Sequence, residues 1–154
     1  MPSFKKLVIS FLPPFLAGFL GSVFTFPAIP GWYEGLNKPS FSPPNFIFGP
    51  VWTLLYFLMG VSFYLVLSSK NKDKKESYFV FALQVVFNTL WSFAFFGLRS
   101  PLLGALVIII LWFLIVLMII KFYRLNKLAG LLNLPYLAWV SFATILNLSV
   151  YALN

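Results

Sequence analysis

The stretch SPLLGALVIIILWFLIVLMII, residues 100–120, contains no charged residue. A helix needs about 20 apolar residues to cross about 30 Å of hydrocarbon, so this stretch is long enough to span a membrane. Four further charge-free stretches of at least that length follow the same pattern: 7–33, 39–69, 77–98 and 128–154. Only 9% of all residues are charged and 61% are hydrophobic, whereas a soluble domain carries about 25% charged residues. The composition therefore predicts an integral membrane protein.

The five stretches predict helices and not a barrel, since none shows the alternation of polar and apolar residues typical of barrel strands. We expect one all-α domain over 1–154, a bundle of five transmembrane helices at about 5–27, 46–68, 78–97, 102–122 and 134–152. Prolines mark several ends. Pro27 and Pro30 are expected to close the first helix, and Pro50, Pro101 and Pro135 to stand near the starts of later ones. Pro13 and Pro14 fall inside the first helix and should kink it.

The basic residues predict the orientation of the bundle. Nine lie on one side of the predicted membrane, at positions 5, 6, 70, 72, 74, 75, 121, 124 and 127, and only Lys38 and Arg99 lie on the other. By the positive-inside rule the N-terminus is cytoplasmic and the C-terminus outside, in a bacterial plasma membrane. A cleaved signal peptide is the alternative interpretation of the N-terminus, but the apolar run there is longer than such a peptide needs. The net charge of +8 is then explained by basic loops that set the topology and contact lipid headgroups, and not by nucleic-acid binding.

Several kinds of chemistry are disfavoured by what the chain lacks. It has no Cys and no His, so zinc sites, histidine-bound haem and Ser-His-Asp catalysis are not expected. The acidic residues are Glu34, Asp73 and Glu76, all in predicted loops, so no membrane carboxylate is available for a proton relay. An ion-coupled transporter is therefore disfavoured.

Three predicted helices carry aromatic and amide residues at helical spacing. Gln84, Asn88 and Trp91 share one face of the third helix, and Trp139, Ala143 and Asn147 share one face of the fifth. Trp52 and Tyr56 are one turn apart in the second. Hydrogen bonds between packed helices explain the amides, and an interfacial aromatic belt is a common use of Trp and Tyr. The other interpretation is a cavity whose flat rings stack on a planar apolar ligand while an amide orients it.

The connector between the first two helices, WYEGLNKPSFSPPNFIFGPVW (32–52), is long and rich in proline and aromatic residues. Together with NTLWSFAFFG (88–97) and PYLAWVSFATILN (135–147), it resembles the signature segments of the translocator protein family, also called tryptophan-rich sensory proteins or TspO. AGFLGSVFT (17–25) resembles the first helix of that family. The resemblance covers nearly the whole chain and indicates a bacterial-type member.

This resemblance implies a five-helix bundle, often a homodimer, whose long first loop covers a ligand pocket. Family members bind porphyrins such as protoporphyrin IX, and many bind isoquinoline carboxamides and benzodiazepines. Matched to the family's motifs, the expected ligand-binding residues are Tyr33, Pro43, Pro44, Trp52, Asn88, Trp91, Trp139 and Ala143. No cofactor or metal is expected, and metal-free porphyrin should bind at least as well as haem.

Three functions remain open at this point. The resemblance favours a receptor or sensor for tetrapyrroles. Some relatives are associated with breakdown of bound porphyrin by light and oxygen, for which Trp52 and Trp139 are the candidate residues; the alternative is that these rings only stack. The third is transport of porphyrin or sterol. The proposed cholesterol motif of mammalian relatives is absent, because Leu148 and Ala152 stand at its Tyr and Arg positions.

Small residues in the first helix predict a close helix contact. Ala17 with Gly21 and Gly18 with Ser22 are each four residues apart. This spacing allows close approach within the bundle as well as between two protomers.

Overall fold

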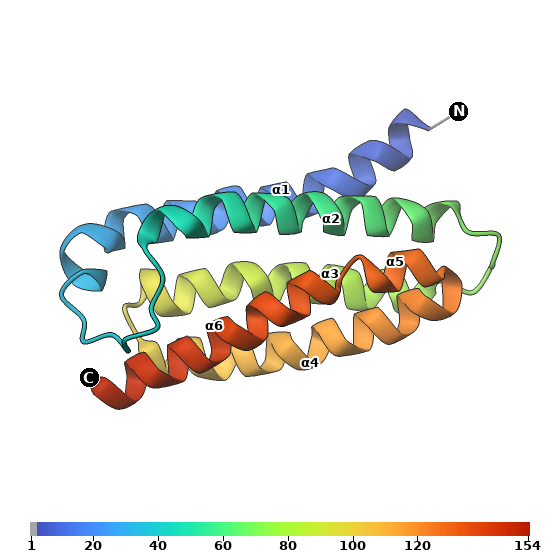
Figure 1. The fold of residues 1–154 in the computed structure, drawn as a ribbon. Coiled ribbons are helices and arrows are strands. Elements are labelled where there is room, and N and C mark those ends of the chain that lie inside the picture. The colour runs from blue at the N-terminus through green and yellow to red at the C-terminus, as the bar shows by residue number, and fades with distance from the viewer. Residues whose placement is uncertain (1–2) are drawn as a thin grey trace.

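Five long helices lie side by side in the computed structural model, which describes residues 3–154 (Figure 1). All five are long and apolar enough to cross a membrane. The predicted fold class, an all-α bundle of five transmembrane helices, is confirmed, and the protein is an integral multi-pass membrane protein. The elements are α1 (Phe4–Ala28), η1 (Ile29–Tyr33), η2 (Asn45–Ile47), α2 (Phe48–Ser68), α3 (Lys75–Ser92), η3 (Phe93–Gly97), α4 (Pro101–Leu125), α5 (Lys127–Leu131) and α6 (Leu134–Leu153).

The observed ends differ from the predicted ones by a few residues, and α5 is a short helix that the sequence did not predict. The first helix closes at Pro27 and Pro30 as expected, since α1 ends at Ala28 between them. The chain reverses at Pro30 and Gly31, where Gly31 has a φ of 102° that glycine adopts readily. Figure 1 shows the first turns of α1, before Pro13 and Pro14, inclined away from the rest of the helix.

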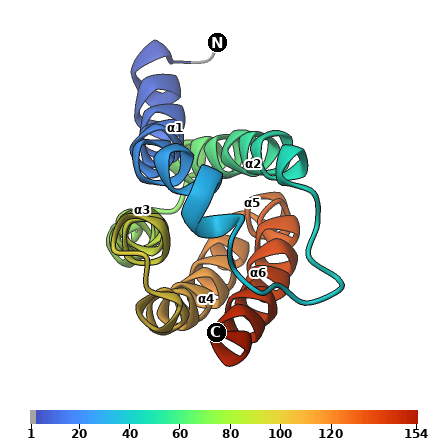
Figure 2. The same ribbon diagram turned by 90° about the vertical axis from the view of Figure 1, so that its left-hand side faces the viewer.

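The helices form a ring around a common core. Viewed from the end in Figure 2, α1 lies between α2 and α3, and α4 lies between α3 and α6. The core is densest in the half of the bundle that contains the basic loops, where the ring of Phe63 stacks on that of Phe81 at 3.8 Å and Phe122 lies beside both. This half is well packed and contributes the apolar burial that holds the bundle together.

Polar side chains close the bundle at the same end. Asn133, at the break between α5 and α6, donates through Nδ2 to Ser62 Oγ of α2 at 2.6 Å and to the Ala129 carbonyl at 3.0 Å. Ser62 Oγ in turn donates to the Ala129 carbonyl at 2.7 Å. Lys121 and Glu76 form an ion pair between α4 and α3. The break between α5 and α6 is therefore held against α2 by hydrogen bonds.

Candidate functional site

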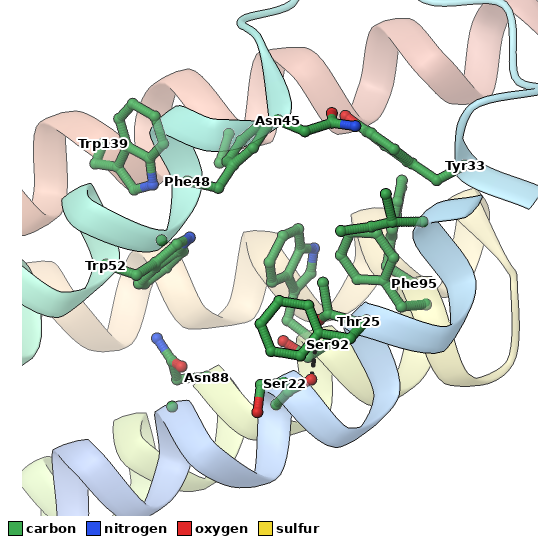
Figure 3. Close-up of a pocket in the computed structure, with 18 of the residues that line it drawn as sticks. Ser22, Thr25, Tyr33, Asn45, Phe48, Trp52, Asn88, Ser92, Phe95 and Trp139 are labelled. Atoms are coloured by element: carbon green, nitrogen blue, oxygen red, sulfur yellow. Dashed lines mark hydrogen bonds between the residues drawn. The ribbon is translucent and has the colours of Figure 1, made fainter.

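A cavity of about 370 Å³ lies at the opposite end of the bundle, where α1, α3 and α6 end and α2 begins. Its walls come from α1, α2, α3, α6 and the irregular turns η1, η2 and η3 (Figure 3). Small-molecule sites have volumes of about 300 to 1,000 Å³, so the cavity has the size of a ligand pocket. We call it the pocket, and we call this end of the bundle the pocket end.

Six of the eight ligand-binding residues expected from the sequence line the pocket: Tyr33, Trp52, Asn88, Trp91, Trp139 and Ala143. They come from η1, α2, α3 and α6, four segments that are far apart in the chain. The pattern of aromatic and amide residues on single helix faces therefore converges on one space. Gln84 does not line the pocket and lies one layer deeper.

Pro43 and Pro44 are not among the lining residues, in contrast to the expectation for the covering loop. The loop that contains them is drawn toward the end of α6, where Asn37 N donates to Asn154 Oδ1 at 3.0 Å and Asn154 Nδ2 donates to the Asn37 carbonyl at 2.9 Å. Figure 2 shows η1 crossing the end of the bundle while the rest of the loop passes around the outside of α6. The cover of the pocket is therefore η1 with Tyr33, together with Asn45 and Phe48 after the proline pair.

Aromatic rings form a nearly parallel row along one wall of the pocket. Trp52 stacks on Tyr56 with centroids 5.6 Å apart and planes at 27°, and lies 6.3 Å from Trp91 at 31°. Trp91 continues the row to Phe95 at 5.8 Å and 28°. All four rings line the cavity. Another flat ring could extend the row, since offset stacking of aromatic systems is favourable.

The floor of the pocket is a chain of buried hydrogen bonds. Tyr56 donates its hydroxyl to Asn88 Oδ1 at 3.0 Å, and Asn88 Nδ2 donates to the Tyr136 hydroxyl at 2.9 Å. Tyr136 then donates to Gln84 Oε1 at 2.9 Å. Each of these side chains lies between helices and forms a hydrogen bond with the next one. Helix packing therefore accounts for the presence of Gln84 in the third helix. Asn88 belongs to the network and to the pocket surface at once.

Asn147 also has both roles. Its Oδ1 accepts a hydrogen bond from Trp91 Nε1 at 3.0 Å, and its Nδ2 donates to the Pro101 carbonyl at 2.8 Å. It thus connects α6 to α3 and α4 and fixes the orientation of a pocket tryptophan. The amide predicted from spacing alone is a packing residue that also positions the pocket wall.

Trp139 differs from Trp91, whose indole N–H is bonded to Asn147, because its polar atom is unpaired. Its Nε1 is buried and has no hydrogen-bond partner among residues 3–154. The centroid of its ring lies 5.9 Å from that of Phe48 and 5.5 Å from that of Phe142. Figure 3 shows Phe48 beside it. A buried donor without a partner costs about 1 to 3 kcal/mol. An acceptor on a ligand that reaches this N–H would satisfy it.

Several pocket residues were not among the expected ligand-binding residues. Gly18, Ser22 and Thr25 line the α1 wall at helical spacing, and Ser92 faces them from α3. The close contact predicted for the small residues of α1 is found within the bundle: Gly18 faces the ring of Tyr56 and Gly21 faces Ser92. Phe95 is four residues after Trp91, a spacing that could have identified it.

The pocket opens between α1 and α2. The lining residues that are also exposed belong to these two helices and to the turn before α2: Phe15, Phe19, Phe26, Asn45, Gly49 and Thr53. The largest exposed side chains among them are apolar, with Phe19 at 65% and Phe26 at 70% exposure. Since these helices cross a membrane, this opening faces lipid.

The fold and the pocket define an integral membrane protein of five helices with a small-molecule site at one end. Residues 10–153 match the TspO/MBR family. The chain is 45% identical to the tryptophan-rich protein TspO of Archaeoglobus fulgidus, over 97% of each chain. It is 37% identical to the protein CrtK of Rhodobacter capsulatus, over 99% of this chain and 94% of the relative. It is 35% identical to the human translocator protein, over 93% of this chain and 86% of the relative. The chain belongs to the TspO/MBR family.

Proposed function

We propose that this protein is a membrane receptor or sensor that binds porphyrins of the protoporphyrin IX type in the pocket. Isoquinoline carboxamides and benzodiazepines are further ligands of the same site. The observation that carries the proposal is the row of nearly parallel rings from Tyr56 through Trp52 and Trp91 to Phe95 along the wall of an uncharged cavity. Such a row favours a flat, apolar, conjugated ligand over a flexible or strongly polar one.

Porphyrin without iron is the preferred form in this proposal. The chain has no His or Cys to ligate haem iron, which leaves tyrosines of the pocket as the oxygen donors. The Tyr56 hydroxyl is already engaged with Asn88. Haem should therefore bind no more tightly than protoporphyrin IX, and an absorption spectrum of haem with a bound axial ligand would contradict this.

A substitution that fills the pocket tests the proposal. Ala143 is buried and lines the cavity, so the larger side chain of Ala143→Phe should occupy the space needed by the ligand. Ile145→Phe is the matched control, because Ile145 lies on the same helix with 58% of its surface exposed and does not line the pocket. Titration of protoporphyrin IX in detergent, in darkness, should show greatly weakened binding by Ala143→Phe and normal binding by Ile145→Phe. Equal affinities in a folded Ala143→Phe variant would place the ligand elsewhere.

Slow breakdown of bound porphyrin by light and oxygen is a second candidate function. It is favoured by the position of Trp52 within the stacked row, next to both Tyr56 and Trp91. An indole in such a row can lose an electron to an excited ligand while neighbouring rings share the oxidation. Trp139 lies outside the row, beside Phe48 and Phe142, so its contribution would be through its unpaired N–H.

Transport of porphyrin or sterol is the remaining alternative. No Asp or Glu lines the pocket, so an ion-coupled mechanism has no carboxylate there to carry a proton. The nine basic residues at the end opposite the pocket support a cytoplasmic N-terminus and a pocket on the outer side of a plasma membrane. A homodimer is part of the proposal by analogy with the family, and cross-linking in native membranes would test it.

A further inference from the structure

The pocket has no charged side chain in its lining, and this limits how an acidic ligand can lie in it. No Lys, Arg, Asp or Glu is among the residues that surround the cavity. A carboxylate transferred into such surroundings without a charged partner is strongly disfavoured. A porphyrin of the proposed type carries two carboxylates on one edge of its ring. That edge must therefore stay at the rim of the pocket, and the apolar edge must point toward the floor at Asn88.

Lys38 provides a positive charge at the rim. Its Nζ lies 4.7 Å from the centroid of the Tyr33 ring, a cation–π distance, and 3.4 Å from the Glu34 carbonyl. Tyr33 lines the pocket, so the ammonium group contacts a residue of the pocket wall. Figure 3 shows the hydroxyl of Tyr33 directed toward Asn45, which is exposed and also lines the pocket. Lys38 thus lies beside the cover of the pocket, against Tyr33.

The backbone next to Lys38 is held by hydrogen bonds, whereas the ammonium group of Lys38 is not paired with a carboxylate of the described part of the chain. Asn37 is held by reciprocal hydrogen bonds with Asn154 at 3.0 and 2.9 Å. Within residues 3–154 the ion pair that forms is Lys121 with Glu76, at the other end of the bundle, so no carboxylate within 4.0 Å neutralises Lys38. The lysine stem is flexible and its charge is a compact point charge, so Nζ can swing from the Tyr33 ring to a nearby anion.

Arg99 is the other cation at the pocket end, and it lies in a different place. It lines a separate shallow hollow with Trp32, Ser100 and Tyr151, between η3 and the end of α6. It does not line the pocket and is exposed. Arg99 therefore serves as a matched control for a charge at this end of the bundle that is not directed at the ligand.

We infer that Lys38 binds a carboxylate of the ligand at the rim and selects acidic tetrapyrroles over neutral ones. This inference rests on the proposed function and names the group that orients the ligand in the pocket. It places the two carboxylates under η1 and the loop, at the membrane surface, and the rest of the ring between α1, α2 and α3. Lys38 acts as a specificity residue and leaves the stacking contacts unchanged.

The test compares an acid with its neutral ester. Protoporphyrin IX and its dimethyl ester share the ring, so the ester measures stacking and the difference between the two measures the charge. Binding is followed by fluorescence in neutral detergent, in darkness, at low and at high NaCl, for wild type, Lys38→Met, Lys38→Arg and Arg99→Gln. Lys38→Met should weaken binding of the acid about three- to tenfold at low salt, since the pair is partly exposed and screened. Binding of the ester should be unchanged.

The remaining variants separate charge from packing. Lys38→Arg should restore binding of the acid, Arg99→Gln should behave as wild type, and the preference of wild type for the acid should fall at high salt. Equal binding of the acid by wild type and Lys38→Met would overturn the inference while the proposed function stands. A parallel loss of the ester would also overturn it, because Lys38 would then act by packing on Tyr33. If wild type binds neither compound, the proposed function fails and the inference fails with it.

Discussion

Trp91 of α3 donates its indole N–H to Asn147 Oδ1 of α6 at 3.0 Å, and the same amide donates to the Pro101 carbonyl at the start of α4. One side chain thereby joins three helices and sets the orientation of a pocket ring. Substitutions of these residues and of their neighbours should therefore change protein stability or ligand binding.

Replacement of Asn147 by leucine should destabilise the protein and weaken ligand binding together. The substitution leaves Trp91 Nε1 and the Pro101 carbonyl without partners, which should lower the free energy of unfolding by about 1 to 2 kcal/mol. Thermal unfolding in detergent and porphyrin titration are the measurements. Ser149→Ala is the control, because the Ser149 hydroxyl donates only to the Ile145 carbonyl of its own helix. Unchanged melting of Asn147→Leu would show that the amide contributes no stability.

A methyl group at Gly18 should disturb the floor of the pocket. A Cβ there would lie 2.6 Å from Tyr56 Cε2, and Tyr56 cannot move freely because it is buried and bonded to Asn88. Gly18→Ala should therefore cost about 1 to 3 kcal/mol of stability and weaken porphyrin binding. Gly49→Ala is the matched control: Gly49 also lines the pocket, but a Cβ there meets nothing within 4 Å. Similar stability and porphyrin affinity of Gly18→Ala and Gly49→Ala would contradict this prediction.

Asn133→Ala should separate stability from ligand binding. The variant loses the hydrogen bonds to Ser62 Oγ and the Ala129 carbonyl, with an expected loss of about 1 kcal/mol. The pocket lies at the other end of the bundle, so porphyrin affinity at a temperature where the variant is folded should equal that of wild type. The control is Asn71→Ala, which removes an amide side chain from an exposed loop and should leave stability unchanged. A clear loss of affinity in Asn133→Ala would reveal coupling between the two ends.

The light-dependent candidate function predicts different effects for two tryptophans. Trp52→Phe replaces an indole within the stacked row by a phenyl ring, whereas Trp139→Phe makes the same replacement outside the row. Bleaching of bound protoporphyrin IX under illumination in air should slow more in Trp52→Phe than in Trp139→Phe, at ligand saturation. Samples kept in darkness or without oxygen are the controls. Identical bleaching by wild type and both variants would assign the reaction to the porphyrin alone.

Much of the fold could be predicted because it depends on local properties of the chain. Five charge-free runs of sufficient length correspond to the five long helices, and the amide and tryptophan spacing in 84–91 and 139–147 identified faces that meet at or beside the pocket. Helical periodicity alone shows that Asn88 and Trp91 point the same way. It does not show that Asn88 bonds to Tyr56 and Tyr136, since those partners are 32 and 48 residues away.

The cover of the pocket was predicted only in part, because it depends on contacts that the sequence does not display. The family resemblance implied that the proline-rich loop covers the pocket, but the pair of asparagines at 37 and 154, 117 residues apart, holds this loop toward α6. Gly31, with its positive φ, turns η1 across the end of the bundle in its place. The hydroxyl wall of α1 was missed because small residues at that spacing also fit ordinary helix packing.

The sequence by itself determined that the protein is a membrane protein with five spanning helices and that aromatic and amide side chains share single faces of some of them, because hydrocarbon thickness and helical period act on neighbouring residues. The tertiary structure alone decided which rings share a stacked row, which amides are used for packing, and that Lys38 lies over Tyr33 at the rim. Those features depend on distances between helices, which are set only when segments far apart in the sequence pack against one another.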